Sequence, residues 1–226
     1  MVVLKALGQQ RREMVFRYEA MGYIHSVNMM EAMLKVPREE FMHPSYKNFA
    51  YEDHPSPIPG DGMQTISAPY MYPATYEPLD LKMGDHFLEI GAGSGYGAAL
   101  ASELVGQKGE VTAIEINSDT YHFARANLDR TGYKDVALVL GDGSLGYPLK
   151  APYDSISVTA ASPDFPPPLI EQLRAPGKMI APIGSPSIYG QDFVLMEKKL
   201  DSSLTKRVLM KVAYVPLLGK YGWDIG

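Results

Sequence analysis

The fold of this chain is decided by the stretch His86-Phe87-Leu88-Glu89-Ile90-Gly91-Ala92-Gly93-Ser94-Gly95-Tyr96-Gly97. An apolar run ends in four glycines at every second position, and an alanine-rich helical pattern follows over residues 97–105. Glycine allows the backbone to turn sharply after a strand and leaves room for a ligand against the main chain. The stretch therefore predicts a nucleotide-type cofactor site at the carboxyl end of the first strand of an α/β sheet.

Length and composition indicate an ordinary folded protein. The chain has 226 residues, 46% of them hydrophobic and 21% charged, which suits one α/β domain with a sizeable core. We expect a single domain over 1–226, with N-terminal helices and a substrate loop in 1–83, the cofactor-binding core in 84–185 and C-terminal strands in 186–226. The formal net charge of −5 argues against a general affinity for nucleic acid.

The sequence lacks the features of cysteine chemistry, metal binding, membrane insertion and secretion. Without cysteine it offers no disulfide, thiolate nucleophile or Cys-ligated zinc. The five histidines are scattered and form no His-Glu-x-x-His pattern, so we predict no metal site. No apolar run approaches the roughly 18 residues of a membrane span, and no signal peptide is recognisable. We therefore expect a cytoplasmic protein without a membrane partner.

Alternating strand and helix patterns begin near residue 84. We predict strands at 86–90, 110–116, 136–140, 153–159 and 178–183, and helices at 97–105, 118–131 and 167–174. Before them we expect two helices within 8–35, broken at Gly22, and a proline-rich loop over 37–62; after them, a hairpin from 192–199 and 206–215. The alternation predicts a doubly wound, Rossmann-like, mainly parallel sheet with helices on both faces and an antiparallel hairpin at its edge.

A glycine-rich turn of this kind binds a nucleoside triphosphate, a dinucleotide or S-adenosylmethionine. The triphosphate loop requires a lysine after its second glycine, and the first lysine after this turn is Lys108. The dinucleotide pattern can be placed on residues 93–98, where it is a weak match. The tighter spacing of Gly91, Gly93 and Gly95 suits a ligand whose methionine part passes over the turn.

Two carboxylates follow the next two predicted strands. Glu115 stands 20 positions after Gly95, where an open α/β site places an acidic residue on ribose hydroxyls, as either cofactor would require. Asp142, between Gly141 and Gly143, can accept the exocyclic amine of an adenine. Each could also be an ordinary capping or turn residue, but three such features at three successive strand ends favour S-adenosylmethionine, which carries a sulfonium cation and no phosphate.

Eight segments look like the motifs of one known family and occur in the same order. They are 36–41, 51–55, 64–69, 88–96, 141–143, 152–154, 158–161 and 214–217. Through them the chain resembles the protein-L-isoaspartate O-methyltransferase family from about Met21 to Trp223, with 64–69 and 214–217 as the most specific motifs. The resemblance implies a class I S-adenosylmethionine-dependent methyltransferase that methylates the α-carboxylate of isoaspartyl residues in damaged peptides and proteins, a repair reaction.

The resemblance also assigns residues. Ser67 matches the active-site serine, which we expect to orient the substrate carboxylate rather than to attack it, because no Gly-x-Ser-x-Gly motif surrounds it. The substrate-binding residues are expected to be Asp53, Thr65, Ile66, Ala68 and Val215, with Asp53 either catalytic or structural. The cofactor-binding residues are expected to be Gln64, Thr65, Ile66, Ser67, Glu89, Gly91, Ala92, Gly93, Ser94, Gly95, Tyr96, Glu115, Ile116, Gly141, Asp142 and Gly143.

Two departures from the family pattern stand near Ser67. Residues 59–63 make the loop before Gln64 about two residues longer than is usual, and Tyr72 replaces a histidine that some members have near the cofactor. Three other functions stay open: a methyltransferase acting on RNA or a small molecule, a dinucleotide oxidoreductase, and a non-catalytic binding module with this fold. The choice between monomer and homo-oligomer also stays open.

Overall fold

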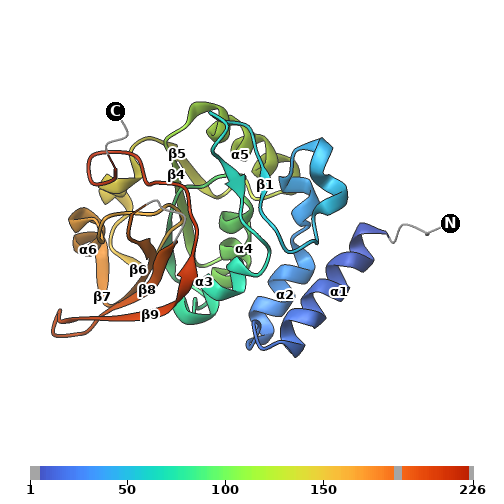
Figure 1. Cartoon of the computed structure of the whole chain (residues 1–226). Coiled ribbons are helices and arrows are strands. Elements are labelled where there is room, and N and C mark those ends of the chain that lie inside the picture. Colours follow the sequence, from blue (N-terminus) through green and yellow to red (C-terminus); the bar gives the residue numbers. More distant parts are fainter. Residues whose placement is uncertain (1–5, 186–189, 224–226) are drawn as a thin grey trace.

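A central sheet organises the molecule (Figure 1). The structure is a computed structural model that describes residues 6–185 and 190–223, and in this part of the chain the sheet has seven strands in the order β5-β4-β3-β6-β7-β8-β9. The strands are β3 (His86–Ile90), β4 (Glu110–Glu115), β5 (Ala137–Leu140), β6 (Tyr153–Val158), β7 (Leu173–Ile183), β8 (Gln191–Lys198) and β9 (Leu204–Val212). Strands β3 to β7 are parallel, and β8 and β9 add an antiparallel hairpin.

The strand order reverses beside β3. Two connections carry the chain from β3 to β4 and β5, and the next strand, β6, returns to the other side of β3. Ile90 pairs with Ile114 of β4 and with Val158 of β6, so the carboxyl ends of the three strands are level. In open α/β sheets this reversal point opens a crevice in which ligands bind.

Each face of the sheet is covered by its own hydrophobic core, because successive side chains of a strand point to opposite faces. Phe87 and Phe193 belong to one core, with α4 (Tyr96–Val105) and α5 (Ser118–Thr131) above it. Their neighbours Leu88 and Val194 belong to the other, which α6 (Pro167–Gln172) covers. This confirms the predicted doubly wound sheet with helices on both faces.

The N-terminal part packs on the first of these faces. Helices α1 (Leu7–Ala20) and α2 (Val27–Lys35) lie side by side and carry the chain toward α4 (Figure 1). The remaining short elements are η1 (Arg38–Phe41), η2 (Pro44–Phe49), β1 (Ser56–Pro57), α3 (Met71–Leu79), η3 (Gly143–Leu145) and η4 (Pro148–Lys150), and β1 pairs with β2 (Thr65–Ile66). Residues 64–72, which run through β2 into α3, line a pocket together with the carboxyl ends of the parallel strands.

The predicted elements agree with the structure closely, with four main differences. The largest difference in bounds is that β7 begins at Leu173, five residues before the strand predicted at 178–183. Helix α5 has the predicted bounds, since Asn117 caps its first turn and Gly132 ends it with φ +91. Helix α3 escaped prediction because it contains Pro73 and Pro78. Pro73 is the third residue of the helix, where a backbone N–H needs no partner within the helix. Helix α6 ends at Gln172, two residues early, and β9 ends at Val212, three residues early.

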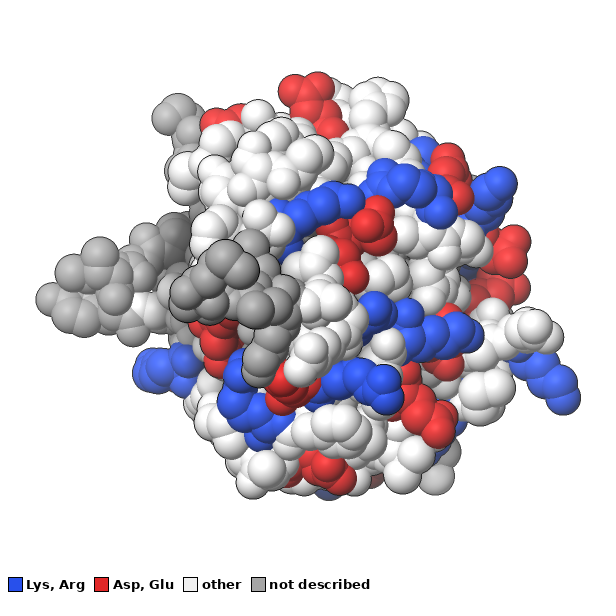
Figure 2. Space-filling view, turned by 90° about the vertical axis from the view of Figure 1, so that its right-hand side faces the viewer, with Lys and Arg blue, Asp and Glu red and all other residues white. Residues whose placement is uncertain are grey.

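Charged side chains of both signs share the face formed by α1, α2 and their neighbours. Figure 2, which views the molecule from the right-hand side of Figure 1, shows basic and acidic groups interspersed there. Ion pairs account for part of this mixture: Lys35 lies 2.7 Å from Glu103, and Lys47 lies 3.2 Å from Glu40. In the described part of the chain, none of the helices has the length and apolar character that crossing a membrane requires.

Strand β9 forms one edge of the sheet and is largely exposed. Solvent reaches each residue from Leu204 to Val208, including Lys206 and the apolar Val208. The register between β8 and β9 shifts between Phe193 and Val194, so β9 carries a bulge. Lys206 pairs with Asp164 of the loop before α6 at 2.9 Å.

Candidate active site

A pocket of about 380 Å³ opens at the reversal point of the sheet. Its floor is formed by the carboxyl ends of β3, β4 and β6, and its walls by residues 64–72 and 212–218. Of the residues expected at the site, those lining the pocket are Gln64, Thr65, Ile66, Ser67, Ala68, Glu89, Gly91, Ala92, Gly93, Ser94, Glu115, Ile116, Gly143 and Val215. Segments that are distant in the sequence therefore meet in one cavity.

The glycine turn follows β3 and can be built only with glycine at its first position. Gly91 has φ +88, a value that other residues rarely adopt. A Cβ at Gly91 would also overlap the hydroxyl of Thr159, which lies 2.9 Å from the carbonyl oxygen of Ile90 and 2.7 Å from that of Gly91. Thr159 thus fixes the carbonyls at the start of the turn.

Glu115 anchors the middle of the turn from the end of β4. Its Oε2 accepts a hydrogen bond from the backbone N–H of Gly93 at 3.0 Å, and its Oε1 accepts from those of Ile116 and Asn117 at 2.9 and 3.0 Å. Burial raises the pKa of Glu115, although the three backbone donors act in the opposite direction. The carboxylate lines the pocket in a fixed orientation, with lone pairs left for the hydroxyls of a ribose.

Glu89 is a buried acid with an unused oxygen. It is 3% exposed, and among the described residues its Oε2 has no hydrogen-bond partner, while its Oε1 lies 3.5 Å from the hydroxyl of Tyr76. Burial raises the pKa of Glu89 to about 8. The described lining of the pocket contains no lysine, arginine or histidine beside these two acids. Such a site favours a cationic ligand over a phosphate.

Asp142 turns toward the C-terminal segment. Its Oδ1 accepts hydrogen bonds from the backbone N–H and the hydroxyl of Ser144 at 2.9 and 2.7 Å, and its Oδ2 accepts from the backbone N–H of Lys220 at 2.8 Å. Gly219 lies so close that a Cβ there would overlap the carboxylate. Asp142 thus joins residues 219–221 to the end of β5. Its neighbour Gly143 lines the pocket, and Asp142 itself is outside the described lining.

Ser67 stands on the wall opposite the glycine turn, between two tyrosines. It is half-buried, and Tyr72 and Tyr214 line the same pocket. Burial raises the pKa of Tyr72 to about 12, partly offset by the guanidinium of Arg38, which lies beneath the ring with Cζ 5.9 Å from its centroid. Burial likewise raises the pKa of Tyr214, against the effect of the Ser67 hydroxyl. Both phenols are therefore neutral hydrogen-bond donors at physiological pH.

Besides Asp142, four of the expected site residues lie away from the described pocket lining. The exposed Asp53 accepts a hydrogen bond from the hydroxyl of Tyr18 at 2.7 Å, a contact that ties the loop to α1. Gly95 lies against α5, and the Tyr96 ring contacts Phe41 with a centroid separation of 5.5 Å. The fourth is Gly141, whose backbone N–H donates to the carbonyl oxygen of Glu115 at 2.9 Å.

Comparison with known proteins places this site in a family. Residues 9–222 match the family model of protein-L-isoaspartate(D-aspartate) O-methyltransferase. The chain belongs to this family. It is 48% identical to the protein-L-isoaspartate O-methyltransferase of Hyperthermus butylicus, over 95% of this chain and 91% of that one. It is 44% identical to the enzyme of that name from Pyrococcus horikoshii, over 97% of each chain.

Solved structures support the same assignment. One with the description protein-L-isoaspartate O-methyltransferase superposes with a TM-score of 0.85 at 33% identity, covering 94% of this chain and 67% of that one. A putative family member from Plasmodium falciparum, solved in complex with S-adenosyl-L-homocysteine, has the same fold. Its TM-score is 0.77 at 24% identity, and the match covers 92% of this chain and 98% of that one.

The family's cofactor, S-adenosylmethionine, fits the residues present. Among the described residues Oε2 of Glu89 has no partner, so this buried acid fits the positive charge of the cofactor, and Glu115, which lines the pocket, fits its hydroxyls. The half-exposed Gly93 leaves its side of the turn open, since the nearest atom to a Cβ there would be 3.8 Å away. The expected preference for S-adenosylmethionine over a nucleoside triphosphate or dinucleotide is thereby confirmed at the level of the family.

The loop that departs from the usual family length is held by its own side chains. Gln64 reaches back so that its Oε1 accepts a hydrogen bond from the backbone N–H of Asp61 at 3.0 Å. The hydroxyl of Thr120, in the first turn of α5, donates to the carbonyl oxygen of Pro59 at 2.7 Å. The extra residues thus lie over the start of α5, and residues 64–68 still reach the pocket.

Several pocket residues escaped the sequence-based assignment. Thr159 and Ala160 follow β6 at the reversal point, where the strand-order rule alone would have directed attention to them. Tyr76 belongs to α3, the helix hidden by its prolines, and no sequence signal marked it. Tyr214 stands within a segment that the family motif includes, next to the assigned Val215.

Proposed function

We propose that this chain holds an isoaspartyl peptide and S-adenosylmethionine in the one pocket, with Ser67 orienting the acceptor carboxylate. The activity is that of its family, methyl transfer to the α-carboxyl of L-isoaspartyl residues in damaged proteins. One observation carries the proposal: the acidic glycine turn and Ser67 line the same cavity. Glu89, Glu115 and residues 91–94 would hold the cofactor.

The chemistry requires placement more than proton transfer. A peptide α-carboxyl group has a pKa near 3.5, so at neutral pH the acceptor is already a carboxylate nucleophile. When bound, S-adenosylmethionine supplies a methyl group on a positively charged sulfur, which leaves as a neutral thioether. The protein's contribution is to aim one carboxylate oxygen along the line of the breaking bond and to exclude water.

Ser67 is suited to that placement. Its hydroxyl can donate to one oxygen of the acceptor carboxylate and leave the other free to react. Tyr72 and Tyr214 flank it with neutral phenols, whose raised pKa values keep their protons available as further donors. Three neutral donors hold a carboxylate without the tight ion pair that would make it a weaker nucleophile.

The peptide would bind along the wall made by Thr65, Ile66, Ala68 and Val215. The carbonyl oxygen of Val215 accepts from the backbone N–H of Ala161 at 2.7 Å, which anchors this strand-like segment to the end of β6. An extended substrate can pair with remaining backbone groups of such a segment. We assign Asp53 a structural role, because its carboxylate is bonded to Tyr18 and lies outside the described lining.

Paired peptides test the proposal. The protein is incubated with methyl-labelled S-adenosylmethionine and two peptides that differ only in an isoaspartyl or aspartyl linkage. We expect base-labile label on the isoaspartyl peptide alone. Ser67→Ala should lower kcat/KM for that peptide by at least about tenfold, the cost of one lost hydrogen bond to a charged group. Ser45→Ala, at an exposed position of η2, is the matched control.

Each contrary result has a definite meaning. Equal labelling of both peptides, or of neither, would overturn the isoaspartyl assignment. Label on RNA in place of peptide would favour the nucleic-acid alternative. Wild-type labelling by Ser67→Ala would remove the role given to the serine and leave the family activity in place.

A further inference from the structure

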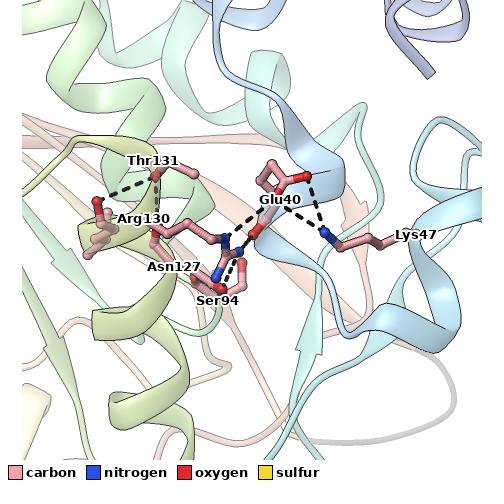
Figure 3. Close-up of polar contacts among 7 residues, drawn as sticks. Glu40, Lys47, Ser94, Asn127, Arg130 and Thr131 are labelled. Atoms are coloured by element: carbon pink, nitrogen blue, oxygen red, sulfur yellow. Dashed lines mark hydrogen bonds and ion pairs between the residues drawn. The ribbon is translucent and has the colours of Figure 1, made fainter. Parts of the chain in front are cut away.

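Asn127 contacts the glycine turn from α5. Its side chain is 1% exposed, and its Nδ2 donates a hydrogen bond to the carbonyl oxygen of Ser94 at 3.0 Å (Figure 3). The next residue of the turn, Gly95, lies against the same helix, where a Cβ would be 3.0 Å from Cγ of Leu128. Helix α5 is therefore the surface on which the turn rests, and Asn127 is a polar attachment between them.

Arg130 fixes which way the amide of Asn127 faces. One turn along α5, its Nη2 donates to Oδ1 of Asn127 at 3.0 Å. A guanidinium group only donates hydrogen bonds, so the amide oxygen must face Arg130 and the amide nitrogen must face Ser94. Arg130, which lies outside the glycine turn, thus sets the orientation in which the Asn127 amide donates to Ser94.

Glu40 in turn holds Arg130. The Nε of Arg130 lies 3.3 Å from the Glu40 carboxylate, and its Nη2 also donates to the Glu40 carbonyl oxygen (Figure 3). Lys47 lies 3.2 Å from the same carboxylate. Partial burial acts to raise the pKa of Glu40, but Lys47 and Arg130 outweigh it and lower the pKa, which keeps the group ionised. A continuous set of contacts runs from η1 to the glycine turn.

We propose that Asn127 is a positioning residue for cofactor binding, held in its working orientation by Arg130 and Glu40. The inference rests on the proposed function, since it presumes that the turn receives S-adenosylmethionine. Ser94 is 3% exposed, so its carbonyl oxygen cannot exchange Asn127 for bulk water without movement of the turn. That movement would displace Gly93, whose N–H is bonded to Glu115, and so would weaken cofactor binding before any effect on the transfer step.

Two substitutions on α5, one from amide to carboxylate and one from carboxylate to amide, test the proposal. Asn127→Asp keeps the shape of the side chain, but it removes the donor and sets a carboxylate oxygen against the carbonyl of Ser94. Asp129→Asn is the matched control, because it makes the reverse change on the same helix, where Asp129 pairs with Arg125 at 2.9 Å. The measurements are the dissociation constant of S-adenosylhomocysteine by titration calorimetry, the melting temperature without ligand, and kcat and KM for both substrates.

We expect Asn127→Asp to weaken S-adenosylhomocysteine binding by at least about tenfold. KM for S-adenosylmethionine should rise in parallel, while kcat and KM for the peptide change little. Arg130→Ala, at a half-exposed position that leaves the core intact, should weaken ligand binding about threefold, because Asn127 then loses its fixed orientation. Asp129→Asn should bind like the wild type.

Two contrary outcomes would distinguish a failure of the role given to Asn127 from a failure of the proposed function. Wild-type affinity in both Asn127→Asp and Arg130→Ala, with a lowered melting temperature alone, would show a merely structural role and overturn this inference. A wild-type protein that binds no S-adenosylhomocysteine would instead overturn the proposed function and, with it, this inference.

Discussion

Replacing Glu89 by glutamine should make the protein without ligand less sensitive to alkaline pH. Glu89 is buried beneath the glycine turn, and its Oε2 has no partner among the described residues. Burial raises its pKa from the ordinary 4.5 to about 8. A carboxyl group whose pKa is higher in the folded state than in the unfolded state binds more protons when folded. Its contribution to stability is therefore complete below pH 4.5 and is lost as the pH rises toward 8.

The size of the effect follows from the same two pKa values. Each pH unit between them lowers the free energy of unfolding by about 1.4 kcal/mol. The whole interval from 4.5 to about 8 corresponds to about 5 kcal/mol. Over the accessible range from pH 6 to pH 8 the expected loss is about 2 to 3 kcal/mol, a large share of a typical total stability.

Urea denaturation at several pH values between 6 and 9 measures this directly. The free energy of unfolding of the wild type should fall relative to that of Glu89→Gln as the pH rises, and the difference should level off above about pH 8. The change in the difference with pH is the quantity of interest, because the amide has its own cost of burial at every pH. Glu103→Gln is a suitable control, since Glu103 pairs with Lys35 near the surface.

Two parallel stability curves would refute the reasoning, because they would show that Glu89 does not change protonation in this range. The same logic extends to ligand binding. A cationic ligand beside Glu89 favours its ionised form, so wild-type affinity for S-adenosylmethionine should rise from pH 6 to pH 8, while that of Glu89→Gln stays level. A wild-type affinity independent of pH would show that Glu89 does not interact with the positive charge of the ligand.

Two further substitutions test how the turn and the C-terminal segment are held. Gly91→Ala should cost about 2 kcal/mol more than Gly132→Ala, since both have positive φ but only a Cβ at Gly91 meets the hydroxyl of Thr159. Urea denaturation measures the difference, and Thr159→Ala in the same chain should remove most of it; equal costs at the two glycines would contradict the packing argument. Asp142→Ala removes the acceptor for the backbone N–H of Lys220, so residues 219–221 should become sensitive to protease and methyl transfer should be lost. If Asp142→Ala resists protease and keeps its methyl-transfer activity, Asp142 does not hold the C-terminal segment in its working position.

Much of the fold could be predicted because local and long-range signals agree along the core. The bounds of α5 follow from a capping asparagine and a terminal glycine, and the parallel strands follow from short apolar runs between helices. Helix α3 could not be predicted in this way. Its prolines are tolerated because of where they fall in the helix, and its buried side chains pack against a face that only the assembled sheet provides.

The site was predictable where chemistry requires one residue type and less so where it depends on neighbours. Gly91 must be glycine because of its backbone, and its place in the pocket followed from the sequence. Asp142 follows its strand at a position where a carboxylate can accept the amine of an adenine. The sequence could not reveal that residues 219–221 would fold back on this carboxylate. Asn127 carries no motif signal, since its importance lies in a contact with Ser94, 33 residues away.

The exposed edge of β9 matters for a protein whose family acts on damaged chains. Aged and partly unfolded proteins present unpaired strands, which readily extend any free sheet edge that they meet. Along β9 the bulge interrupts the regular ladder, and Lys206 and Lys211 place charges beside it, each paired with an aspartate of this chain. The edge is thereby a poor template for further strands. We expect this edge to limit aggregation when the enzyme meets partly unfolded substrates.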